Sequence, residues 1–338
     1  MMGGAGNDTY VVDATGDIVD ETSGAGTDTV ESTVTFSLSS ATQVRGNVEN
    51  LTLLGTGAIN GTGNALANVI TGNSGNNILA GLGGADTLTG GLGLDTASYA
   101  ASGSGVTVSL TTGTGSGGDA EGDTLNEIEN LTGSNHNDVL EGSSGNNALT
   151  GGLGIDTVTY AAASAGVKVN LALTTAQNTF GAGIDTLSGI ENLTGSNHDD
   201  VLTGSTAANV ISGGSGNDSI NGGAGNDTMM GGTGADSFVF NSALGATNID
   251  TLSDFSVIDD TIQLENTGVF TGLTAIGVLS ASAFRTGSAA LDADDRILYD
   301  IDTGRVLYDV DGLGVQSAVQ FASLATGLSL TSADFLVI

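Results

Sequence analysis

The chain of 338 residues contains no cysteine, no proline and no tryptophan, and lysine and arginine together number only five. The lack of cysteine excludes a disulfide framework, so we expect bound metal to supply the crosslinks that such a fold needs. Asp and Glu number 38, which leaves a net charge of −33. This balance argues against nucleic acid and against an anionic membrane surface as partners, because contacts with phosphate need Lys and Arg.

Targeting segments are also missing. The opening residues, MMGGAGNDTY, have neither the basic region nor the apolar region of a signal peptide. No apolar run reaches the roughly 18 residues that a membrane-crossing helix needs, so we expect no transmembrane segment. The chain opens inside a repeat. This predicts that it is the C-terminal part of something longer, or that it begins at an artificial boundary.

What the sequence has in abundance is one nonapeptide, Gly-Gly-Xaa-Gly-Xaa-Asp-Xaa-apolar-Xaa. Runs of it cover 63–98, 133–159 and 195–239, and a lone copy, GGAGNDTYV, lies at 3–11. Glycine adopts positive φ without a steric penalty, so the first six residues can form a tight turn. The last three residues fit a short strand whose apolar eighth side chain points inward. One copy buries little, so copies must stack, and the pattern predicts an all-β protein built on a parallel β-roll, a β-solenoid.

The sixth position of the nonapeptide is acidic or amidic throughout. Closely spaced turn carbonyls together with a carboxylate form an all-oxygen site, which suits Ca²⁺. Asparagine offers only a neutral oxygen, so we expect the sites of the Asn copies to be weaker or partly occupied. The sixth residues are Asp8, Asp86, Asp95, Asp138, Asp156, Asp200, Asp218, Asp227 and Asp236, with Asn68, Asn77, Asn147 and Asn209 in the other copies.

Recurring in register, this nonapeptide resembles that of the repeats-in-toxin (RTX) family of secreted bacterial proteins. The resemblance implies that two nonapeptides complete one coil and that Ca²⁺ lies between turns on the same side. Asp200, Asp218 and Asp236 would then share one edge, and Asn209 and Asp227 the other. On the same basis Asn68 pairs with Asp86, Asn77 with Asp95, and Asp138 with Asp156.

We expect the strongest calcium sites at 213–239, where the acidic register is densest. The candidate ligands there are Asp218, Asp227 and Asp236 with their turn glycines, Gly213, Gly214, Gly216, Gly222, Gly223, Gly225, Gly231, Gly232 and Gly234.

The sequence divides into three predicted regions: a β-rich N-terminal segment at 1–62, a calcium-binding roll at 63–240, and a β-rich C-terminal domain at 241–338. The roll contains two related longer stretches, 99–132 and 160–194. Within them 106–110 and 167–171 alternate apolar and polar residues, which predicts half-buried strands. We interpret these stretches as wider coils of the same solenoid; a protruding loop that binds a partner is the alternative. The motif ENLT, at 49–52, 129–132 and 191–194, is interpreted as setting the register of the block that follows.

The C-terminal region carries a second resemblance. NIDTLSDFSVIDDTIQLE at 248–265 is similar to the start of the domain that follows the repeats in serralysin-type proteases, which implies that Asp250 and Asp254 help to bind a last Ca²⁺. Residues 296–312 predict a hairpin with Leu298 and Leu307 on its two strands. The ending ADFLVI resembles the uncleaved C-terminal signal of type I secretion substrates. It implies a type I exporter as partner and an extracellular location, with retention at the cell surface as the alternative.

No catalytic motif is evident. The two histidines, His136 and His198, lie in different repeats at the fourth turn position, so no zinc motif HExxH exists, and GxSxG is absent. The acidic residues fall at metal-ligand positions, and none is marked as a catalytic acid or base. We therefore predict a protein without a catalytic site of its own.

The function that follows is a calcium-binding module that folds on extracellular Ca²⁺ after type I secretion. Two alternatives stay open. One is a structural or adhesive surface protein, of the S-layer or biofilm kind, which would self-associate in Ca²⁺. The other is the C-terminal part of a larger secreted hydrolase such as a metalloprotease, which the upstream reading frame would reveal.

Overall fold

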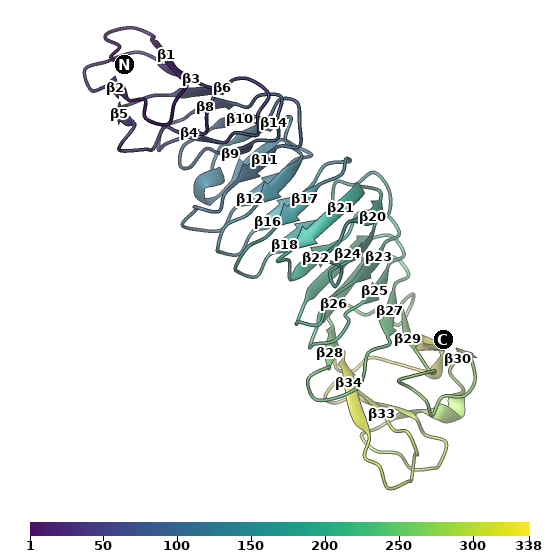
Figure 1. The fold of residues 1–338 in the computed structure, drawn as a ribbon. Coiled ribbons are helices and arrows are strands. Elements are labelled where there is room, and N and C mark those ends of the chain that lie inside the picture. The colour runs from purple at the N-terminus through teal and green to yellow at the C-terminus, as the bar shows by residue number, and fades with distance from the viewer. The chain divides into compact units, whose positions relative to one another are not determined.

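Short β-strands, most of them three or four residues long, build the protein, and they pair mainly in parallel (Figure 1). The computed structural model describes all 338 residues. The only helical elements are three single-turn 3₁₀ segments: η1 (Gly118–Ala120), η2 (Ala281–Ala283) and η3 (Ser332–Asp334). The chain divides into two units, one of residues 1–158 and 183–190 and the other of residues 159–182 and 191–338. The predicted all-β, β-roll fold is confirmed.

The first unit contains two parallel ladders. One ladder runs through β1 (Thr9–Val12), β3 (Thr29–Ser32), β6 (Asn50–Leu53), β8 (Val69–Thr71), β10 (Thr87–Thr89) and β14 (Thr124–Asn126). The other runs through β4 (Phe36–Ser37), β7 (Gly61–Thr62), β9 (Ile78–Ala80), β11 (Thr96–Ser98), β15 (Asn130–Thr132), β17 (Ala148–Thr150) and β21 (Gly183–Ser188). A separate pair joins β2 (Val19–Glu21) to β5 (Val44–Gly46). Coils of the roll therefore precede residue 63.

The second unit repeats this plan. One ladder runs through β22 (Asn192–Thr194), β24 (Val210–Ser215), β26 (Thr228–Thr233) and β28 (Asp250–Leu252). The other runs through β19 (Lys168–Asn170), β23 (Val201–Thr203), β25 (Ser219–Asn221), β27 (Ser237–Phe240), β29 (Thr261–Leu264) and β35 (Phe335–Val337). The chain's last strand is thus a coil strand, with Phe335 and Val337 buried. The central part of the chain contains two further strands, β18 (Thr157–Thr159) and β20 (Gln177–Phe180).

The core of each unit is a column of eighth-position side chains. Leu202, Ile211, Ile220, Met229 and Phe238 are fully buried, because the strands on both sides of a coil turn these residues inward. Neighbours in a ladder lie in register, so that Ile211 pairs with Met229 and Ile220 pairs with Phe238. Each coil therefore buries its apolar side chains against the coils above and below it, as stacked repeats require.

Both longer stretches contribute strands to the roll, and the first contains one strand more than the alternation predicts. β12 (Thr107–Ser109) pairs in parallel with β16 (Val139–Glu141), and β19 pairs in parallel with β23, so both predicted strands lie in the roll. In the first stretch the chain also inserts β13 (Thr114–Ser116), which pairs antiparallel with both β12 and β14. Alternation along the sequence predicts the coil strands, but it does not predict this inserted strand.

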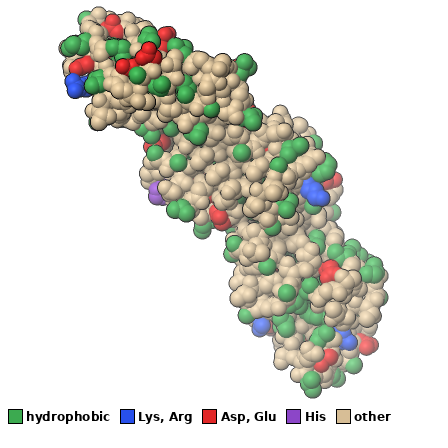
Figure 2. Space-filling model, in the orientation of Figure 1, with side chains coloured by type: hydrophobic (Ala, Val, Ile, Leu, Met, Phe, Trp, Pro, Cys, Tyr) green, Lys and Arg blue, Asp and Glu red, His purple; other side chains and the backbone are tan.

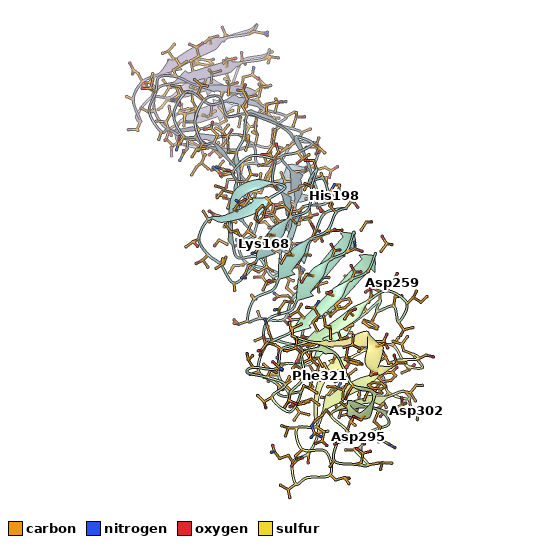
Figure 3. All side chains as sticks on the ribbon, turned by 90° about the vertical axis from the view of Figure 1, so that its right-hand side faces the viewer. Lys168, His198, Asp259, Asp295, Asp302 and Phe321 are labelled. Atoms are coloured by element: carbon orange, nitrogen blue, oxygen red, sulfur yellow. The ribbon has the colours of Figure 1, made fainter.

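The C-terminal part adds antiparallel structure to the second unit. β32 (Ile297–Asp300) and β33 (Arg305–Tyr308) form the predicted hairpin, with Leu298 opposite Leu307. β34 (Val319–Ser323) pairs with β33 and with the coil strand β28, while β30 (Gly277–Val278) and β31 (Phe284–Thr286) pair with β35 and β32. Phe321, labelled in Figure 3, packs edge-on against Phe240 and Phe270, at ring-centroid distances of 5.0 Å and 5.1 Å.

Candidate calcium site

The sixth-position acids form hydrogen-bonded ladders inside the roll. In the second unit the backbone N–H of Asp200 donates to Asp218 Oδ1 at 2.8 Å, and that of Asp218 donates to Asp236 Oδ1 at 2.9 Å. On the other edge Asn209 N–H donates to Asp227 Oδ1 at 2.8 Å. These pairings are the ones that the repeat register implied. The same bond joins Asn68 to Asp86, Asn77 to Asp95, and Asp138 to Asp156 in the first unit. One oxygen of each acid thus holds two coils together.

Acids outside the nonapeptides extend these ladders, and sequence reasoning missed most of them. Asp123 Oδ1 accepts from Asp86 N–H at 2.8 Å, and Asp260 Oδ1 accepts from Asp236 N–H at 3.0 Å. A signal was available, because each such Asp opens an Asp-Thr-apolar triplet, as the sixth to eighth residues of many repeats do. The triplets begin at Asp28, Asp123, Asp185, Asp250 and Asp260.

The turns fall into two classes, which we call closed and open. They differ in whether the sixth side chain accepts a hydrogen bond from the backbone N–H of the second residue of its own turn. In a closed turn the second residue is Ser or Asn, and its backbone N–H donates to the sixth side chain. Ser196 N–H, for example, donates to Asp200 Oδ2 at 2.6 Å, while Ser196 Oγ accepts from His198 N–H. His198 itself is exposed at the turn (Figure 3). The closed turns are those of Asn68, Asn77, Asp138, Asn147, Asp200 and Asn209.

In an open turn the second residue has positive φ, and its N–H does not reach the acid. Gly214, Gly223 and Gly232 have φ of 109°, 91° and 97°. The same holds at Gly91, Gly152 and even Leu82, with φ of 100°, 116° and 66°. The consequence is a buried carboxylate oxygen without any hydrogen-bond donor, Oδ2 of Asp86, Asp95, Asp218, Asp227 and Asp236.

The first glycine of the turn makes room for that oxygen. A Cβ at Gly213 would lie 2.2 Å from Asp218 Oδ2, and one at Gly231 would lie 2.2 Å from Asp236 Oδ2. Carbonyls of the preceding turn close the other side, since a Cβ at Gly232 would lie 1.9 Å from Gly214 O. Carbonyl and carboxylate oxygens are therefore concentrated between successive turns, with no side chain to fill the space.

Leaving a buried carboxylate oxygen without a partner is costly. Burial raises the pKa of Asp218 to about 7, with the charges of Asp200 and Asp236 adding to the effect. Burial also raises the pKa of Asp86 and of Asp227 to about 6. Each open turn therefore requires either a proton or a cation on its acid. Hard oxygen ligands without nitrogen or sulfur suit Ca²⁺, so these residues fit the ion that the repeat implies.

The Asn copies have a structural explanation. In each of them the side-chain Nδ2 donates to a backbone carbonyl of the preceding coil, where an Asp would place an oxygen against another oxygen. The acceptors are Glu49 O for Asn68, Ile59 O for Asn77, Glu129 O for Asn147 and Glu191 O for Asn209. Three of these four acceptors are the Glu of an ENLT motif. The side chain of Glu129 also stands where a ladder acid would, because its Oε2 accepts a hydrogen bond from Asp95 N–H at 2.8 Å.

The remaining predicted ligands lie at the two ends of the ladders. Asp250 Oδ1 accepts from Asp227 N–H at 3.1 Å, and burial together with the charge of Asp227 raises the pKa of Asp250 to about 7. Asp254 lies elsewhere, because its two oxygens accept from Gly231 and Gly232 N–H, each at 2.9 Å. Asp250 therefore joins an open turn, and Asp254 caps the start of one. Asp8 Oδ2 is buried without a donor, like the acids of the open turns.

The net charge of the chain is carried partly inside it. The ladder acids are buried, so the face in Figure 2 shows mostly small polar residues and backbone, with acidic side chains in scattered patches.

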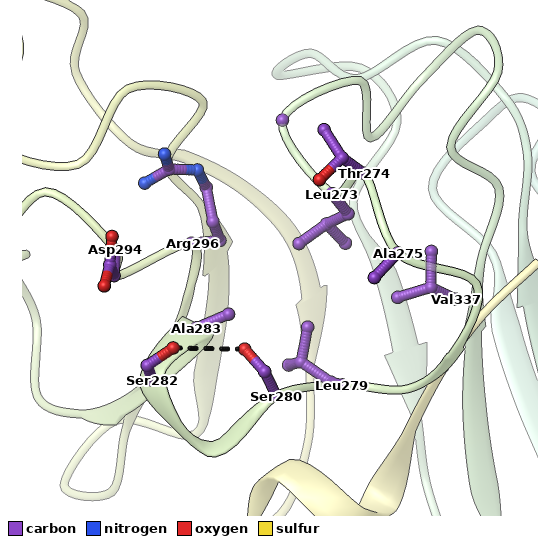
Figure 4. A pocket seen from close by; sticks show the side chains of 11 residues that line it. Leu273, Thr274, Ala275, Leu279, Ser280, Ser282, Ala283, Asp294, Arg296 and Val337 are labelled. Carbon is purple, nitrogen blue, oxygen red and sulfur yellow. Dashed lines mark hydrogen bonds between the residues drawn. The ribbon is translucent and has the colours of Figure 1, made fainter.

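A separate hollow of about 270 Å³ lies in the C-terminal part, lined by Leu273, Leu279, Arg296, Val337 and the hydrogen-bonded pair Ser280 and Ser282 (Figure 4). No helix of the structure has the length and apolar character to cross a membrane.

Comparison with known proteins agrees with this geometry. The family model described as the RTX calcium-binding nonapeptide repeat (4 copies) matches residues 62–97, 123–158, 185–214, 194–229 and 203–238. Two of these ranges begin at Asp123 and Asp185, the triplet acids described above. No curated protein matches the chain.

Among solved structures the chain is similar to the extracellular lipase LipA from Serratia marcescens, at 13% sequence identity and a TM-score of 0.19. The match covers 84% of this chain and 40% of that one, and so weak a likeness carries no argument about activity.

The matched repeats and the ladder of buried acids lead to one conclusion: the chain carries RTX calcium-binding nonapeptide repeats, and Ca²⁺ is the ion that they bind.

Proposed function

We propose that this chain is a secreted module without a catalytic site of its own, and that it folds when Ca²⁺ binds to the open turns. The observation that carries the proposal is the set of buried Oδ2 atoms without donors at Asp86, Asp95, Asp218, Asp227 and Asp236. Such atoms oppose folding when they are charged and unpartnered. Bound Ca²⁺ would supply the positive charge that they lack, so its binding energy becomes folding energy.

Secretion through a type I exporter fits the same physics. RTX repeats are typical of secreted extracellular proteins, and extracellular calcium modules bind at about 10⁻⁴–10⁻³ M, well above cytosolic Ca²⁺ levels. The C-terminal residues Phe335 and Val337 are buried against β29 in the folded chain. An exporter that recognises this end must therefore meet it before the roll has formed, and low calcium inside the cell would keep it accessible.

A calcium titration of the full chain, followed by far-UV circular dichroism, tests the proposal. We expect little β signal in chelator and a cooperative rise as Ca²⁺ reaches the extracellular range. A β signal that is already complete in excess chelator would contradict folding on calcium. Export is tested separately, by deleting residues 333–338 and measuring secretion from cells that carry a type I exporter; undiminished secretion would refute the C-terminal signal.

A further inference from the structure

A second kind of acidic site lies outside the matched repeats, around Glu21 in β2. The strand turns this side chain inward, and Glu21 is only 5% exposed. Neither Oε1 nor Oε2 has a hydrogen-bond partner. An interior glutamate with two unsatisfied oxygens differs from the turn acids, whose Oδ1 is held by the preceding coil. Its burial therefore needs an explanation of its own.

Two more carboxylates converge on Glu21. One oxygen from each of Asp8, Glu21 and Asp28 lies within 4.8 Å of the other two. Asp8 precedes β1, and Asp28 precedes β3 in the next coil, where its Oδ1 accepts from Asp8 N–H at 2.8 Å. The hydroxyl of Tyr10 is also buried without a partner. Three successive segments of the chain thus deliver oxygen atoms to one cluster.

The backbone leaves space for these oxygens only because glycine stands opposite them. A Cβ at Gly3 would lie 2.2 Å from Tyr10 Oη, 2.3 Å from Glu21 Oε1 and 2.7 Å from Asp8 Oδ2. Gly24 likewise faces Glu21 Oε2. A hollow of about 280 Å³, lined by Glu21, Gly24 and Asp28 among others, opens beside the cluster.

No basic side chain neutralises this cluster. The ion pair of β2 with β5 joins Asp20 to Arg45 at 3.4 Å, and both lie on the outward side of the pair of strands. Burial raises the pKa of Glu21, and the charges of Asp28, Asp8 and Glu49 add to that shift. Three carboxylates this close cannot all stay ionised unless a cation lies among them.

We propose that Glu21 and Asp28 join Asp8, the sixth residue of the lone copy at 3–11, in binding one further Ca²⁺, with the Tyr10 hydroxyl beside it. The interior glutamate distinguishes this site from the other turn sites of the repeats. An all-oxygen ligand set excludes a preference for Zn²⁺. Mg²⁺ demands near-octahedral geometry and keeps several waters, whereas Ca²⁺ accepts irregular sets of carboxylates. The site extends calcium binding to the coils at 1–62, which the matched repeats do not reach.

The test compares the number of Ca²⁺ ions bound by the full chain and by two variants that lose the same charge. Glu21→Gln removes the interior carboxylate, whereas Glu31→Gln changes a half-exposed neighbour on β3 that points away from the core. Flow dialysis with ⁴⁵Ca²⁺ at saturation should find one ion fewer for Glu21→Gln and no change for Glu31→Gln. An unchanged count for Glu21→Gln would overturn the site, because it would mean that Glu21 is simply protonated.

Terbium luminescence provides a readout that does not depend on the folding of Glu21→Gln. Tb³⁺ replaces Ca²⁺ at oxygen sites and is excited by energy transfer from a nearby tyrosine. Tyr10→Phe should remove one part of the sensitised emission while the ion count stays as in the unchanged chain. Emission that Tyr10→Phe leaves intact would also overturn the proposal. Neither result bears on folding by the repeat sites, which the dichroism titration tests.

Discussion

The run at 195–239 contains two stretches that share a period, an apolar column and a hydrogen-bond ladder but differ in what their acids require. The copies at 195–212 have closed turns, in which Ser196 and Ser205 N–H groups donate to the sixth side chain. The copies at 213–239 have open turns, in which Asp218, Asp227 and Asp236 keep a buried oxygen without a donor. In the first stretch hydrogen bonds from the protein satisfy the sixth side chains, whereas in the second each acid still needs a cation or a proton.

The difference depends on the second residue of the turn rather than on the acid itself. Asp200 and Asp218 occupy the same sixth position on the same edge, yet only Asp200 receives a backbone N–H from its own turn. In a coil with a closed turn the sixth side chain is hydrogen-bonded without Ca²⁺. Such a coil therefore offers a formed surface on which the calcium-bound coils can stack. The comparison predicts that calcium dependence resides in the open turns.

The largest effect is expected when the open turns lose their acids. In the triple variant Asp218→Asn, Asp227→Asn and Asp236→Asn, the amide oxygen can keep the ladder bond while the charge is lost. We expect the Ca²⁺ midpoint for folding, followed by circular dichroism, to rise at least about tenfold, since about 1.4 kcal/mol of lost binding energy suffices for that.

The matched control removes the same charge from exposed acids of the same unit, Asp199→Asn, Asp259→Asn and Asp302→Asn, and should shift the midpoint little. The corresponding triple at Asp86, Asp95 and Asp156 should shift it less than the triple at 213–239. Equal shifts for these two triples would contradict the ranking of the sites.

A change of pH should have an intermediate effect, with opposite signs in the two metal states. The pKa of Asp218 is raised to about 7 and that of Asp227 to about 6, above the ordinary value of 3.8. Their contribution to metal-free stability is therefore fully present below about pH 4 and is lost as the pH rises through 6 to 7. With saturating Ca²⁺ the stability should instead rise over that range, because protons compete with the ion.

The β signal at pH 5 and pH 8 in buffer passed over chelating resin measures the first sign, and urea unfolding at the same two pH values in millimolar Ca²⁺ measures the second. The triple Asn variant should lose most of the pH dependence. A metal-free chain that is equally stable at the two pH values would show that the open-turn acids are not desolvated as the structure implies.

The smallest and most specific effect is expected from exchanging the second residue of a turn. Ser196→Gly removes the side chain that holds a closed turn and should allow Asp200 to bind one more Ca²⁺. Gly214→Ser should do the reverse, because Ser is strained at φ of 109° and favours the closed form, in which its N–H would satisfy Asp218. A hydrogen bond of this kind contributes about 1 kcal/mol to metal-free stability.

Ion counts by flow dialysis measure the exchange, and urea unfolding in saturating Ca²⁺ measures its effect on stability. Ser205→Gly is the control, because it opens a turn whose sixth residue is Asn209 and should lower stability without adding an ion. If Ser196→Gly also adds no ion, the second residue does not decide between the two classes.

Much of the candidate site could be predicted from the sequence. The nonapeptide gives the inward column, the acids and the edge that each acid shares, and the bonds from Asp200 to Asp218 and from Asp218 to Asp236 follow that register. The replacement of Asp by Asn in four of the copies was visible as well. Its reason was not, because the carbonyl of Glu191 that Asn209 binds lies one coil away and belongs to a motif of different spacing.

Other residues were hidden by irregular spacing. Asp123 and Asp260 extend the ladders from 37 and 24 residues away, beyond the regular period. Asp254 shares the acidic segment of Asp250 but binds Gly231 and Gly232 N–H instead of facing a turn acid. A pattern with one fixed period cannot place residues whose connecting segments vary in length.

The sequence by itself determined the parallel roll and its ion, because a nine-residue period of glycine, acid and apolar residue admits few other structures. Only the tertiary structure decided which acids lack a donor. That property depends on whether one backbone N–H points toward the carboxylate or away from it, which the φ angle of the second turn residue sets. It also brought Glu21 beside Asp8 and Asp28, since three short segments meet there only after the coils have stacked.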